Sequence, residues 1–151
     1  MIINYNMILV EEKGDLFELD NSWTLAHCVG NDFVMGKGIA KIFKQKFGNQ
    51  DWLIKNSKGI GTALLLSNDK ININVFYLVT KKWSKYSKPN YDDLKSSLVD
   101  MFEQATKNNI TKIAMPQIGC GLDGLKWNVV KNIIQEIKPA GILICIRYLI
   151  D

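Results

Sequence analysis

The chain has 151 residues, of which 47% are hydrophobic and 23% are charged, a balance typical of one globular domain with a full hydrophobic core. Its formal net charge of +4 depends almost wholly on lysine, since Arg147 is the single arginine among 19 basic residues. Lysine attracts phosphate as a point charge but cannot make the forked contact of arginine with guanine. The composition therefore favours an anionic ligand and argues against sequence-specific reading of DNA.

The three cysteines, Cys28, Cys120 and Cys145, are odd in number and widely spaced, so they fit neither a disulfide framework nor a zinc site. We expect no bound metal and a reducing intracellular compartment, either cytoplasmic or nuclear. No apolar run reaches the length of a membrane span, so we expect no membrane partner. Asn4 and Asn6 interrupt the apolar start of the chain, which is not the pattern of a signal peptide.

In chain order, the first predicted elements are a strand at 8–10, a turn at 13–17 and a short buried strand at 23–29. The turn contains Asp15, whose carboxylate is able to accept a hydrogen bond from the amino group of a base. An aspartate after a glycine is more often simple turn chemistry. The second strand carries His27, the only histidine, and a lone histidine is more often a hydrogen-bonded core residue than a catalyst.

A glycine-bearing loop at 31–38 comes next, and the apolar spacing after it predicts a helix. That helix begins near Ile39, and Gly48 is a natural residue to end it. Two further strands are predicted at 62–66 and 71–80, joined by a turn.

Residues 81–89, here called the basic loop, form a lysine-rich segment with two aromatic residues. The simplest interpretation is a solvated loop. A second interpretation makes Lys81 a nucleophile, because the neighbouring charge of Lys82 and partial burial would favour the neutral amine. A neutral amine attacks masked carbonyls such as the anomeric carbon of a sugar. A third interpretation makes the whole loop a nonspecific platform for single-stranded nucleic acid.

Helices and strands alternate through the rest of the chain. We expect a helix with Asn90 as its N-cap, a strand at 113–115, a helix from Trp127 that Pro139 ends, and a long buried strand at 142–150. The full order is β, β, α, β, β, α, β, α, β. It predicts a single α/β domain over 1–151, a three-layer αβα sandwich around a central mixed sheet. Ligands of such folds bind at the carboxyl ends of the strands.

The most informative segment is the glycine-rich loop within 115–127, which follows a strand and precedes a helix. Its three glycines allow positive φ and a close approach of backbone N–H groups to an anion. Asp123 lies inside this loop, where a carboxylate would repel phosphate. It is either the N-cap of the next helix or a group that faces the ligand beyond the phosphates and performs acid–base chemistry. With the loop at 31–38, the chain has two strand–loop–helix units, enough to clamp both ends of a diphosphate.

Several segments together form a known pattern, and they are 14–17, 25–28, 35–40, 44–48, 80–82, 88–89 and 115–127. The run at 118–123, followed by Trp127, is the most specific of them. With these segments the chain resembles a macrodomain almost from end to end. Within that superfamily it resembles the terminal ADP-ribose protein glycohydrolase and its relatives.

The resemblance implies ADP-ribose as ligand or product and no cofactor. It places the amino group of adenine on Asp15, beside the backbone of Leu16, and it places His27 near the distal ribose. In the family's hydrolases the lysine that matches Lys81 attacks the anomeric carbon of the distal ribose. The aspartate that matches Asp123 then transfers a proton and completes release.

The same resemblance implies that two loops wrap the diphosphate and the distal ribose through Met35, Gly36, Lys37, Gly38, Ile39, Ile118, Gly119, Cys120, Gly121 and Leu122. An aromatic residue on the last strand often covers the adenine, and here Tyr148 or Arg147 takes that place. Other macrodomains carry paired asparagines where this chain has residues 27–30. The glycohydrolase subgroup shares this departure, which makes an asparagine-activated water a less favoured mechanism.

The resemblance thus implies a hydrolase that removes mono- or terminal ADP-ribose from acidic side chains or from related acyl or nucleobase linkages. Two alternatives would use the same pocket: an ADP-ribose 1″-phosphate phosphatase and a reader that binds ADP-ribose without turnover. A pure reader needs neither Lys81 nor Asp123. A further alternative is a nucleic-acid module that uses the basic loop. The expected partners are ADP-ribose and ADP-ribosylated protein or nucleic acid, and the chain is expected to be a monomer.

Overall fold

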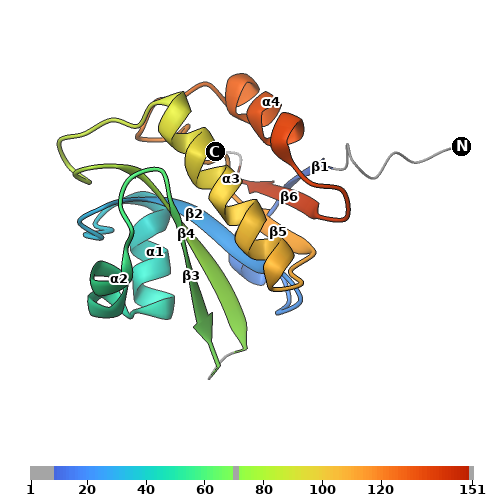
Figure 1. Ribbon diagram of the computed structural model, residues 1–151, viewed down its shortest axis with the longest axis horizontal. Coiled ribbons are helices and arrows are strands. Elements are labelled where there is room, and N and C mark those ends of the chain that lie inside the picture. Colours follow the sequence, from blue (N-terminus) through green and yellow to red (C-terminus); the bar gives the residue numbers. More distant parts are fainter. Residues whose placement is uncertain (1–8, 70–71, 150–151) are drawn as a thin grey trace, which may run out of the picture.

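The computed structural model describes residues 9–69 and 72–149. Its elements follow in the order β1 (Leu9–Lys13), the 3-10 helix η2 (Leu16–Glu18), β2 (Thr24–Gly30), α1 (Gly38–Phe47), α2 (Gln50–Asn56), β3 (Ala63–Asn68), β4 (Ile73–Lys81), α3 (Tyr91–Lys107), β5 (Lys112–Met115), α4 (Trp127–Ile137) and β6 (Leu143–Tyr148) (Figure 1). The helices lie on both sides of a central sheet, so the predicted three-layer α/β sandwich is confirmed.

The sheet has six strands in the order β1-β6-β5-β2-β4-β3. Every neighbouring pair is parallel except β3 and β4, which are antiparallel. The predicted mixed sheet is therefore confirmed. Because β2, β4 and β5 run in the same direction, the loops that follow them gather at one edge, where ligands of such sheets bind.

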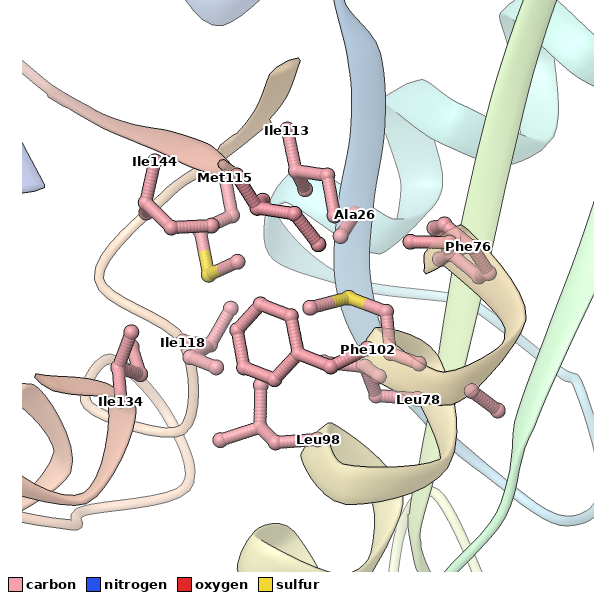
Figure 2. Packing of buried hydrophobic residues seen from close by; sticks show 14 of the residues in the cluster. Ala26, Phe76, Leu78, Leu98, Phe102, Ile113, Met115, Ile118, Ile134 and Ile144 are labelled. Carbon is pink, nitrogen blue, oxygen red and sulfur yellow. The ribbon is translucent and has the colours of Figure 1, made fainter. Parts of the chain in front are cut away.

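Alternating side chains of β4 show how the strands separate two hydrophobic cores. Phe76 and Leu78 pack with α3 and α4 on one face, in the cluster of Figure 2. Val75 and Val79 pack with α1 and α2 on the other face. All four side chains are fully buried, which identifies β4 as a central strand covered on both sides.

The ends of the helices follow predicted local signals. The side chain of Asn90 accepts a hydrogen bond from the Asp93 N–H at 2.7 Å, and Asn90 Nδ2 donates to Asp93 Oδ2 at 3.0 Å. This reciprocal pair gives an acceptor to the Asp93 N–H in the first turn of α3, so the predicted N-cap is confirmed. The predicted end of α1 at Gly48 is also confirmed, with φ of 56° in the region that favours glycine.

Three differences from the predicted elements concern weak local patterns. Helix α2 was not predicted, because Leu53 is its single buried residue and one buried position shows no period. Strand β1 extends to Lys13 and the final strand ends at Tyr148. Ile8, Ile71 and Ile150, which the predicted strands included, lie outside the described residues. No helix in the described part of the chain is long and apolar enough to cross a membrane.

Candidate functional site

Lys81 and Asp123 form an ion pair at the edge where the loops gather. Lys81 is the last residue of β4 and Asp123 lies between β5 and α4. Lys81 Nζ donates to Asp123 Oδ1 at 2.6 Å, with side chains only 12% and 18% exposed. The alternative of Asp123 as an N-cap is wrong, since Lys126 holds that position before α4. An amine and a carboxylate in direct contact suit nucleophilic attack with proton transfer.

The charge nearest to the Lys81 amine is therefore a carboxylate. The side chain of Lys82 lies elsewhere, with its Nζ 5.4 Å from the centroid of the Trp83 ring. The sequence had suggested that the charge of Lys82, together with partial burial, favours the neutral amine of Lys81. In the structure the charged group in contact with the Lys81 amine is instead Asp123, the residue that would accept the proton of the amine.

The two inner glycines of the β5–α4 loop have different roles. Gly119 has φ of 72°, and a Cβ there would lie 2.9 Å from Leu125 Cδ1. Gly121 has no positive φ, and a Cβ there would meet no atom within 4 Å. Of these two glycines, Gly119 uses the positive φ that glycine allows, and Gly121 does not. Gly119 is required by the loop itself, whereas Gly121 borders open space.

Backbone hydrogen bonds inside this loop leave several donors available. Cys120 donates to Gln117, Gly124 donates to Gly121, and Leu125 donates to Gly119. Across the described residues, the N–H groups of Gly119 and Gly121 have no backbone acceptor. Unpaired N–H groups on a glycine-rich loop are the usual donors to a bound anion.

The β2–α1 loop, the second glycine-bearing loop, lies against the first. Phe33 and Met35 have positive φ of 52° and 47°, and both are almost completely buried, so packing holds this backbone in place. A Cβ on Gly38, at the start of α1, would lie 3.7 Å from Leu122 Cδ1. The predicted cradle residues at 35–39 and 118–122 are therefore brought together. Gly36 and Lys37 are exposed beside them.

Hydrogen bonds connect the basic loop to both glycine loops. Asp32 Oδ2 accepts from the Ser84 N–H at 2.9 Å, and Asp32 Oδ1 accepts from the Ser84 hydroxyl. Lys88 Nζ donates to the carbonyl of Leu122 at 2.8 Å. Burial opposes ionisation of Asp32, but the hydrogen bonds from Ser84 and from backbone N–H groups, that of Val34 among them, together outweigh it and lower the pKa of Asp32. The sequence did not indicate that Asp32, Ser84 and Lys88 hold the site together.

The residues predicted to bind adenine, Asp15 and Leu16, follow β1, an outermost strand of the sheet. Asp15 Oδ1 accepts from the Phe17 N–H at 2.9 Å, which confirms the interpretation of Asp15 as a turn residue. Leu16 beside it is buried. Arg147 Nη1 donates to the carbonyl of Asp15 at 3.2 Å, whereas Tyr148 accepts from the Gly14 N–H through its backbone. The side chain on this turn is therefore that of Arg147, and coverage of adenine by Tyr148 stays a prediction.

His27 is fully buried in the core between the sheet and α1. Its ring stacks on Phe43 with centroids 3.8 Å apart and planes at 11°, and it meets the Tyr77 ring edge-on at 4.8 Å. Neither ring nitrogen has a hydrogen-bond partner among the described residues. Burial lowers the pKa of His27 to about 3, so the ring is neutral at pH 7. A role toward the distal ribose stays a prediction.

The cysteines near the site do not compete with Lys81 as nucleophiles. Burial raises the pKa of Cys28, and the charge of Asp123 raises it further. Burial also raises the pKa of Cys120 to about 11, and its thiol donates to the carbonyl of Ile118 at 3.2 Å. Both thiols stay protonated, and the thiolate is the reactive form. No group of three His, Cys, Asp or Glu side chains in the described ranges could hold a metal ion.

A mixed sheet with two glycine loops and a lysine–aspartate ion pair at the carboxyl ends of its strands defines an α/β domain of the class that binds ligands at this edge. The family model for the Macro domain matches residues 26–134, so the chain belongs to the macrodomain family. It is 42% identical over 128 residues to human ADP-ribose glycohydrolase OARD1, covering 85% of this chain and 82% of that protein.

Two further similarities involve longer proteins. The chain is 30% identical over 151 residues to the DNA ADP-ribosyl transferase–DNA ADP-ribosyl glycohydrolase fusion protein of Thermosipho africanus, covering 85% of this chain and 38% of that protein. The solved structure of Thermosipho africanus DarTG in complex with ADP-ribose superposes with a TM-score of 0.79 at 26% identity. That match covers 96% of this chain and 42% of the other.

Proposed function

We propose that this macrodomain is an ADP-ribose glycohydrolase that releases ADP-ribose from modified targets through Lys81 and Asp123. The observation that carries the proposal is their contact at 2.6 Å, made directly beside a loop with free N–H donors. A domain that only binds ADP-ribose would need neither side chain. The similarity to a protein named ADP-ribose glycohydrolase supports hydrolysis, and the similar structure with bound ADP-ribose supports the ligand.

In the proposed reaction, Asp123 takes the proton of the Lys81 ammonium, and the freed amine attacks the anomeric carbon of the distal ribose. The bond between that carbon and the target breaks, and the target leaves with the bonding electrons and with the proton that Asp123 had taken from Lys81. Water then hydrolyses the lysine–ribose linkage. ADP-ribose is released, and the amine is restored.

Binding precedes this chemistry and uses separate groups. The N–H groups of the β5–α4 loop and the start of α1 would hold the diphosphate. Asp15 still has its Oδ2 available, because Oδ1 is the atom that accepts from Phe17. That oxygen would accept from the amino group of adenine. These contacts need no metal or other cofactor.

The proposal extends to the cellular setting and the targets. The targets are ADP-ribosylated protein or nucleic acid, and the chain acts as a monomer of one domain in a reducing compartment. The free thiols of Cys28, Cys120 and Cys145 support such a compartment. Nothing in this mechanism requires a second copy of the chain.

The test is incubation with ADP-ribosylated protein and, separately, with ADP-ribosylated DNA, with free ADP-ribose measured by mass spectrometry. Release from either substrate, lost in Lys81→Ala, supports a glycohydrolase. ADP-ribose 1″-phosphate is assayed in parallel for phosphate release, which would instead identify a phosphatase. Binding of ADP-ribose by calorimetry with no release from any substrate would identify a reader and refute the proposal.

A further inference from the structure

The basic loop displays two aromatic side chains to solvent. Trp83 is 48% exposed and Tyr86 is 81% exposed. Lys85 Nζ lies 5.5 Å from the Tyr86 ring centroid, and Lys82 lies similarly over Trp83. Both rings thus leave large aromatic surfaces in water beside positive charges.

The loop is held in place close to the reacting pair. It begins with Lys81, and the Trp83 N–H donates to Ser87 Oγ at 3.1 Å within the loop. The bonds from Ser84 to Asp32 and from Lys88 to Leu122 tie it to both glycine loops. In Figure 1 the segment between β4 and α3 extends away from the body of the molecule. The aromatic rings are therefore presented on a fixed backbone and not on a free chain.

The charges of the basic loop indicate which kind of partner it binds. Residues 81–89 include four lysines and no acid, and because Lys81 is paired with Asp123, the charges of the other three are available to a partner. The neighbouring Asp32 is occupied by Ser84. An acidic peptide would use the lysines but would leave both rings without a matching flat surface. A single-stranded nucleic acid uses both, since its phosphates meet lysines and its bases stack on aromatic rings.

We propose that the basic loop binds single-stranded nucleic acid on the target side of the Lys81–Asp123 pair, with bases stacked on Trp83 and Tyr86. This inference rests on the proposed function and names its substrate class as an ADP-ribosylated nucleotide within a single strand. The bond that Lys81 attacks joins the distal ribose to its target. The chain of that target therefore begins within reach of the residues next to Lys81. With lysine as its only cation, the loop contacts the backbone and reads no base sequence.

Binding is tested first with an unmodified twelve-residue oligothymidylate, labelled with fluorescein and followed by anisotropy. The variant carrying Trp83→Ala and Tyr86→Ala is expected to bind at least tenfold more weakly, because each stacked base contributes strongly. Affinity of the natural chain should fall with salt, with a slope of roughly −2 in log K against log salt for three phosphate contacts. Trp52→Ala on α2, where the tryptophan is 42% exposed, is the matched control and should bind normally.

Turnover then separates this inference from the proposed function. The double variant should lose at least tenfold in kcat/KM on ADP-ribosylated single-stranded DNA and keep its rate on ADP-ribosylated protein. The loop assignment would be overturned if the double variant affected kcat/KM equally on both substrates, or if it bound oligothymidylate as tightly as the natural chain. Either result would leave the proposed hydrolase function standing. A selective loss on protein would also overturn it, in favour of a peptide partner. Ring-dependent binding without any release of ADP-ribose would refute the hydrolase but support the loop assignment.

Discussion

The buried histidine makes the stability of this domain depend on pH. His27 is fully buried, and burial lowers its pKa from 6.5 to about 3. Below pH 6.5 the unfolded chain binds a proton at this residue and the folded chain does not. The free energy of unfolding therefore falls as the pH falls from 6.5 toward 3 and is unaffected by this residue at higher pH.

The size of the effect follows from the two pKa values. At 1.36 kcal/mol for each unit, the loss reaches about 5 kcal/mol near pH 3 and about 2 kcal/mol at pH 5. A total stability of roughly 5–15 kcal/mol is usual for a domain, so the change at pH 5 is easily measured. Glu11 and Asp32 also have lowered pKa values, but carboxylates with lowered pKa values exchange protons mainly below pH 5. The window from pH 5 to 7 therefore reports on the single histidine.

The assay is urea unfolding followed by tryptophan fluorescence at pH 7, 6 and 5. His27→Phe, which keeps an aromatic ring on Phe43 without a titrating group, should lose less than about 0.5 kcal/mol over this range, as expected without the linkage. Equal stability of the natural chain at pH 7 and 5 would refute the reasoning. If the variant fails to fold, NMR of the natural imidazole decides the question, and titration near pH 6.5 in the folded protein would contradict a buried neutral ring.

Three further predictions concern the site. Lys81→Ala and Lys81→Arg should lower ADP-ribose release by roughly 10³-fold or more, with free ADP-ribose affinity changing far less by calorimetry, and Lys82→Ala as control should stay active. Asp123→Ala should also lose turnover and accumulate a lysine–ADP-ribose adduct, visible as added mass on the intact protein; full activity in this variant would contradict the proton-transfer role. Gly121→Val should weaken ADP-ribose binding at least tenfold without changing the urea midpoint, whereas Gly119→Val should cost about 1–3 kcal/mol of stability through the forced φ and the clash.

The sequence predicted those parts of the fold that depend on local chemistry. Asn90 and Asp93 indicate the start of α3, and Gly48 indicates the end of α1, because helix caps are formed by groups that are neighbours in the chain. The long helices show their buried faces as a period. Helix α2 shows none, since Leu53 is its one buried residue. A short helix with a single anchor is formed by tertiary packing.

Part of the candidate site also could not be predicted from the sequence, because it depends on tertiary contacts between residues far apart in the chain. The bond between Asp32 and Ser84 joins residues 52 apart, and that between Lys88 and Leu122 joins residues 34 apart. No local pattern encodes such pairs. Lys81 and Asp123 were candidates from the residues themselves, and the family resemblance agreed with them. The side chain that lies on the Asp15 turn, that of Arg147, became clear only from the register of β1 against β6.

The contact between Lys81 and Asp123 also resolves a conflict within the sequence. A carboxylate in a loop that binds phosphate would repel the diphosphate at a distance of a few ångströms, at a cost that grows as water is excluded. The ammonium at 2.6 Å makes the pair neutral overall, so the N–H donors of the loop face an anion without an uncompensated negative charge beside them. The partial burial of both side chains strengthens the interaction between them relative to water. The residue that looks out of place in an anion cradle is thus compatible with it, and in the proposed reaction the same contact would give the amine its proton acceptor.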